Sequence, residues 1–74
     1  MEGAIRELRK AVEIRPQFPE AHENLAWVLM DRGDLTGAWS EVHLARKYGG
    51  APDPERLGRL SERMPEPKEN APFR

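Results

Sequence analysis

The chain has 74 residues, no cysteine, and a formal charge of −1 from 12 basic and 13 acidic side chains. This length fits a single domain, and the absence of cysteine excludes disulfides and thiolate metal sites. A near-neutral chain lacks the basic surface that general nucleic-acid binders and anionic-membrane binders need, so we expect neither function.

The spacing of apolar residues predicts helices throughout, because these residues recur at intervals of three or four. The first predicted helix covers residues 4–14 and ends before Pro16. The second begins at Pro19, since proline is tolerated in the first turn of a helix. It ends at Gly33, which can adopt the left-handed conformation that often closes a helix.

Two further helices are predicted in the second half of the chain. The third covers about residues 36–48 and stops at a Gly-Gly pair. The fourth begins at residues 53–54, where an aspartate can cap the helix and a proline can enter its first turn. Residues 65–74 contain three prolines and no apolar period, so we expect a flexible Pro-rich tail after a helical domain over residues 1–64.

The sequence also repeats itself at an interval of 34 or 35 residues. A shift of 34 places Gly3 on Gly37, Ala4 on Ala38, Glu7 on Glu41, Leu8 on Val42, Ala11 on Ala45 and Ile14 on Tyr48. A shift of 35 places Pro19 on Pro54, Leu25 on Leu60, Ala26 on Ser61 and Leu29 on Met64. Most aligned positions are small or apolar, which is where packing would enforce a repeat.

These features resemble the tetratricopeptide repeat (TPR) family, whose unit is a helical hairpin. The segment AHENLAWVLMDRGDLTGAWSEVHLARKY, residues 21–48, is similar to one full repeat. The residues before it are similar to the second helix of a preceding repeat, and the fourth helix to a divergent capping helix. The matching positions are Leu25, Ala26, Leu29, Gly33, Asp34, Ala38, Val42 and Ala45, whereas His22 and Gly50 depart from the family's frequent Trp and Pro.

The resemblance covers about residues 3–64 and implies an all-α fold. Antiparallel hairpins of about four helices would stack in a short superhelical solenoid. The physical reason is independent of the family name. Ala26 facing Ala38 would let two helix backbones approach closely, while larger neighbours fill the flanks.

The first helix would be a second-type helix whose first-type partner is absent from the sequence. Ile5, Leu8 and Val12 would then contact the second helix on one side and nothing evident on the other. Leaving two such side chains in water forgoes roughly 3–6 kcal/mol, which is comparable to the whole stability of a small domain. We therefore expect another chain or a further part of a longer solenoid to cover them, most simply in a two-fold homodimer.

One stripe of the second helix is a candidate binding surface. It consists of Glu20, Glu23, Asn24, Trp27 and Asp31, at helical spacing. By resemblance, first-type helices line the concave groove that holds peptides or partner helices. The stripe would form an acidic floor with an aromatic anchor, suited to a peptide carrying Lys or Arg. The alternative is a solvated helix face on which a neighbouring helix covers Trp27.

No pattern in the chain predicts catalysis or a cofactor. His22 and His43 are the only histidines, too few for a zinc site. No serine triad and no phosphate-binding glycine loop is evident. Arg56, Arg59 and Arg63 share one face of the fourth helix, which we interpret as a solvated surface.

The sequence therefore predicts a non-catalytic protein–protein or peptide-binding scaffold of TPR type that self-associates through its first helix. The alternative is an interaction segment excised from a larger enzyme or from a secretion or assembly component. The expected partner is a protein or a basic peptide, with no nucleic acid, membrane, metal or cofactor. The lack of a secretory signal and of an apolar run of ~20 residues favours a cytoplasmic location.

Overall fold

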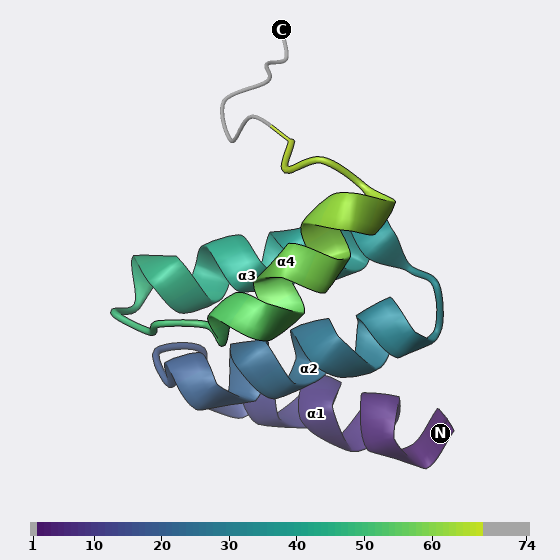
Figure 1. The fold of residues 1–74 in the computed structure, drawn as a ribbon. Coiled ribbons are helices and arrows are strands. Elements are labelled where there is room, and N and C mark those ends of the chain that lie inside the picture. Colours follow the sequence, from purple (N-terminus) through teal and green to yellow (C-terminus); the bar gives the residue numbers. More distant parts are fainter. Residues whose placement is uncertain (1, 68–74) are drawn as a thin grey trace, which may run out of the picture.

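The computed structural model describes residues 2–67 and contains four helices in that range (Figure 1). They are α1 (Glu2–Ile14), α2 (Pro19–Asp31), α3 (Leu35–Lys47) and α4 (Pro54–Arg63). This part of the chain contains no strand, so the predicted all-α fold is confirmed. No helix in it is both long and apolar enough to cross a lipid bilayer.

The helix ends lie within about two residues of the predicted ones, because the capping residues act as their chemistry requires. The Asp34 carboxylate accepts a hydrogen bond from the Gly37 backbone N–H at 3.0 Å, at the start of α3. The Asp53 carboxylate accepts one from the Arg56 N–H at 3.1 Å, at the start of α4. Each aspartate satisfies a donor that the first turn of a helix leaves unpaired.

The helix α2 is the centre of the molecule, with α1 and α3 on its two sides and α4 beside α2 and α3 (Figure 1). The most extensive contact between helices is that of α2 with α3, followed by that of α1 with α2 and then that of α3 with α4. Ala26 and Ala38 are both fully buried, as expected for small residues where helices approach closely. The buried apolar core comprises Leu25, Ala26, Trp27, Leu29, Met30, Ala38, Trp39, Val42, Ala45 and Leu60.

His22 is a buried polar residue that joins α2 to two neighbours. Its Nδ1 lies 2.7 Å from Glu41 Oε1 on α3, and its Nε2 lies 2.7 Å from the backbone oxygen of Pro16. The ring stacks on that of Tyr48 at 5.8 Å. Both nitrogens face acceptors, so both can donate only when the ring is protonated. At this buried position, His22 thus contributes two directional polar contacts in place of apolar packing.

Two hydrogen bonds to backbone oxygens attach α4 to the other helices. Trp39 Nε1 donates to the oxygen of Met64 at 2.9 Å, and Arg63 donates to that of Met30 at 3.1 Å. Leu60 is fully buried beneath them. A single buried leucine and two polar contacts suit a terminal helix whose outer surface is charged.

The segment after α4 continues along α3. The Glu66 carboxylate accepts hydrogen bonds from His43 Nε2 at 2.8 Å and from Arg46 at 2.7 Å. Glu66 belongs to the predicted flexible tail over residues 65–74, of which residues 68–74 lie outside the described part of the chain. Burial alone would raise the pKa of Glu66, but these two hydrogen bonds outweigh it and lower the pKa below 4.5.

Titration of Glu66 tests the contact between this segment and α3. A carboxyl whose pKa is lowered by folding adds stability above its unfolded pKa, and this contribution is lost as the pH falls through the folded pKa. We expect a carbon-13 NMR titration of the Glu66 carboxyl to give a midpoint below 4.5. The same titration in a His43→Ala, Arg46→Ala variant should move towards that ordinary value. A wild-type midpoint at or above it would contradict the contact.

The turn between α3 and α4 depends on two consecutive glycines. Gly49 has φ of +89°, a conformation that glycine adopts without the steric cost of a side chain. Gly50 is crowded: a Cβ there would lie 2.6 Å from Pro19 Cβ and 2.9 Å from the Ala45 oxygen. A Cβ on Gly58, in α4, would meet nothing within 4 Å.

A matched pair of glycine substitutions tests this packing. Gly50→Ala should lower the free energy of unfolding by about 1–3 kcal/mol, because backbone and a proline ring must move. Gly58→Ala should raise it by roughly 0.5–1 kcal/mol, since alanine is the better helix former. Denaturant unfolding followed by circular dichroism measures both. Equal effects of the two substitutions would be inconsistent with the observed turn.

Candidate functional site

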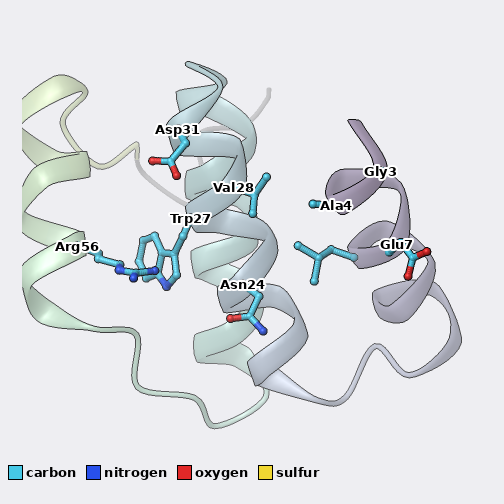
Figure 2. A pocket seen from close by; sticks show the side chains of 9 residues that line it. Gly3, Ala4, Glu7, Asn24, Trp27, Val28, Asp31 and Arg56 are labelled. Atoms are coloured by element: carbon cyan, nitrogen blue, oxygen red, sulfur yellow. The ribbon is translucent and has the colours of Figure 1, made fainter. Parts of the chain in front are cut away.

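An open groove of about 680 Å³ lies between α1 and α2 and reaches α4 at one side (Figure 2). The first turns of α1 contribute Gly3, Ala4, Glu7 and Leu8 to its lining. The helix α2 contributes Asn24, Trp27, Val28 and Asp31, and α4 contributes Arg56. Small residues at the start of α1 leave this space open between two helices that are otherwise packed together.

The groove has an apolar floor and a polar rim. Ala4 and Val28 lie across it from one another (Figure 2). Among its lining residues are two carboxylates, Glu7 and Asp31, and one guanidinium, Arg56, so that the lining carries one excess negative charge. Such a surface can hold an apolar side chain on its floor and attract a cation to its rim.

The predicted binding stripe of α2 is divided between two places. Asn24, Trp27 and Asp31 line the groove, whereas Glu20 and Glu23 do not. The Glu23 carboxylate lies close to Gly50, since Oε2 would be 2.7 Å from a Cβ at that glycine. Glu20 is exposed in the first turn of α2. The stripe therefore supplies one wall of the groove.

Trp27 is covered by the chain itself. Its side chain is 7% exposed, and the guanidinium carbon of Arg56 lies 5.9 Å from its ring centroid (Figure 2). A cation at this distance interacts favourably with the face of an indole ring. The arrangement is the alternative that the sequence left open, with a neighbouring helix over Trp27. Arg56 occupies the place that the sequence analysis assigned to a partner's arginine.

The residues predicted for self-association serve mainly the internal contact of α1. Ile5, Leu8 and Val12 are half-buried and pack against the core around α2. Part of each side chain stays accessible. The outward surface of α1 is formed instead by their neighbours, among them Ala4, Ala11 and Ile14, all three exposed.

A second, smaller hollow of about 240 Å³ lies where α1 turns into α2. Ile14 and Phe18 beside it are 68% and 46% exposed, the large apolar residues with the most exposed surface in the described part of the chain. Ala11 and Ala21 complete its apolar lining, and the Arg15 guanidinium lies 5.5 Å from the Phe18 ring centroid. The sequence pattern did not predict this patch.

Two charged residues that line the groove but do not belong to the predicted stripe come from other helices, Glu7 from α1 and Arg56 from α4. The internal repeat could have pointed to Glu7, because the shift of 34 residues aligns it with Glu41, which contacts His22. No sequence signal points to Arg56, since only the position of α4 brings it to Trp27. Within residues 2–67 no three His, Cys, Asp or Glu side chains are grouped so as to hold a metal ion.

Comparison with known proteins gives one match. A family model described as TPR repeat matches residues 1–33, the part of the chain that contains α1 and α2. The resemblance inferred from the sequence is confirmed over these two helices, and the match does not extend to α3 or α4. No curated protein and no solved structure matches the chain.

Proposed function

We propose that this chain, whose first 33 residues match the TPR repeat, is a non-catalytic module that binds a segment of a partner protein in the groove between α1 and α2. TPR units act in general as protein-interaction scaffolds, because stacked hairpins form extended binding surfaces. The observation that carries the proposal is the open groove itself, with its apolar floor and acidic rim.

The chemistry of the groove favours a basic and apolar segment. Ala4, Leu8 and Val28 offer the apolar floor on which the affinity would depend. Glu7 and Asp31 would each contribute about 0.2–1 kcal/mol as exposed ion pairs, enough to orient a segment with a lysine or arginine. Glu20 and Glu23 would add to the long-range attraction, since residues 19–34 carry four acids and one base.

The role proposed for Trp27 differs from that of an exposed anchor. Its ring is buried and already contacts Arg56, so it supports the wall of the groove. Asn24 is exposed beside it and offers both a donor and an acceptor to the backbone of a bound segment. Substitution of Trp27 would therefore act through the fold, and a test of binding needs exposed residues.

Charge reversal on α2 tests the groove. Binding of a ten-residue peptide of alternating Lys and Leu should weaken roughly fivefold to tenfold in Asp31→Lys, because a rim carboxylate becomes a cation. Glu20→Lys makes the same change of charge outside the groove and should cost less than about twofold. NMR titration gives both affinities. Equal losses in the two variants would show that only the net charge matters.

Self-association is a second candidate function, favoured by the exposed Ile14 and Phe18. Two large apolar side chains at one end of α1 would gain free energy if a second copy covered them. The accessible edges of Ile5, Leu8 and Val12 would extend this surface along the helix.

Sedimentation of the isolated chain tests this candidate. If self-association is the function, the chain should be a dimer at tens of micromolar and Ile14→Lys a monomer, since a buried lysine would face apolar surface. Glu13→Lys, on the adjacent and exposed residue, should leave the dimer intact. A wild-type chain that sediments as a folded monomer at this concentration would exclude the candidate.

A further inference from the structure

The internal repeat gives α1 and α3 helix faces of similar composition, and in α3 this face packs against α2. Ala38, Val42 and Ala45 of α3 are fully buried. Two further residues of the same face contact His22 of α2: Glu41 Oε1 lies 2.7 Å from its Nδ1, and the Tyr48 ring stacks on it. The helix α2 therefore packs on this face of α3.

The helix α1 carries the same face without an occupant among the described residues. The shift of 34 residues aligns Ala38, Glu41, Val42, Ala45 and Tyr48 with Ala4, Glu7, Leu8, Ala11 and Ile14. Leu8 is half-buried and the other four are exposed, Ile14 to 68%. Apart from Leu8, which packs in part against the core, the residues that hold α2 against α3 thus have exposed counterparts on α1.

The neighbouring side of each helix confirms the correspondence. Ile5 of α1 packs against the core around α2, and its counterpart Trp39 donates a hydrogen bond to the Met64 oxygen, just after α4. α1 is therefore related to α2 as α3 is related to α4. It follows that the open place beside α1 corresponds to the place that α2 takes beside α3.

We infer that the open face of α1, with the adjoining wall of α2, binds an amphipathic helix of another protein in the way that α3 binds α2. This inference rests on the proposed function and names the class of partner. The helix needs an N–H donor or cation to meet Glu7, as His22 meets Glu41. It needs a leucine three residues later, a small residue four later and a leucine seven later, the spacing of His22, Leu25, Ala26 and Leu29.

The composition of α4 favours a different protein over a second copy. The open face itself carries both signs of charge, since Glu7 and Asp31 line the groove with Arg56, and Arg6 and Lys10 lie beside Ala11 and Ile14. In α4, the one described helix at the other end of the stack, Ser61 stands where α2 has Ala26, and Leu57 and Leu60 already pack in or against the core. The exposed surface of α4 is charged, so α4 lacks an apolar face for the α1 of another copy.

The chain itself supplies the probe for the test. A blocked peptide with the sequence of residues 18–33 carries the required pattern, since it contains α2. Added to the isotope-labelled full chain, it should shift the backbone amide NMR signals of Ala4, Glu7, Ala11 and Val28 in a saturable manner. A peptide with Ala26→Arg should bind at least roughly tenfold more weakly, because the helices could no longer approach closely.

Two variants of the chain distinguish recognition from general attraction. Glu7→Gln should weaken the peptide roughly fivefold, since it replaces the charged acceptor for the peptide's histidine by a neutral amide oxygen. Glu13→Gln makes the same change of charge on α1, at an exposed residue that lines none of the described hollows, and should leave the affinity unchanged.

The outcomes separate this inference from the proposed function. If the Lys-Leu peptide shifts the groove amides but the residue 18–33 peptide does not, a partner binds there in another form and the helical occupant is excluded. If neither peptide shifts them, both proposals fail. If the amides of α1 change with protein concentration alone and the peptide cannot compete, the occupant is a second copy, which also overturns the inference.

Discussion

The close approach of α2 and α3 is the contact on which the rest of the molecule depends. Ala26 and Ala38 are fully buried, and the small side chains let the two backbones come near enough for Leu25 and Val42 to be fully buried as well. The helix α1 packs against one side of this hairpin and α4 against the other. Among residues 2–67, α2 has neighbouring helices on both sides and α1 on one, so the open surface of this part of the chain lies along α1.

The elements themselves could be predicted from local sequence because local chemistry determines them. Pro19 starts a helix, Asp34 and Asp53 cap the helices that follow, and Gly33 and Gly49 adopt positive φ where two helices end. Each of these effects acts within four residues along the chain. The crowding around Gly50 could not be foreseen in the same way, since it arises from Pro19, which is distant in sequence.

Only part of the candidate site could be predicted. Helical spacing indicates which residues share a face of a helix, but it does not indicate which other segments cover that face. Asn24 and Asp31 line the groove as the spacing suggested, but α4 lies over Trp27 and brings Arg56 to its ring. The internal repeat was the stronger signal. It aligned Glu7 with Glu41 before any contact was known, and only the contact of Glu41 with His22 gave that alignment a chemical meaning.

Hydrogen exchange at α1 and α3 tests most directly whether α1 packs against one neighbouring helix and its counterpart α3 against two. Segments with fewer buried contacts open locally at lower free energy and exchange their amides faster. The amide of Ala11 should exchange roughly tenfold or more faster than that of its counterpart Ala45, at a protein concentration where the chain is monomeric. Equal protection of these two amides in the monomer would contradict an unoccupied face on α1.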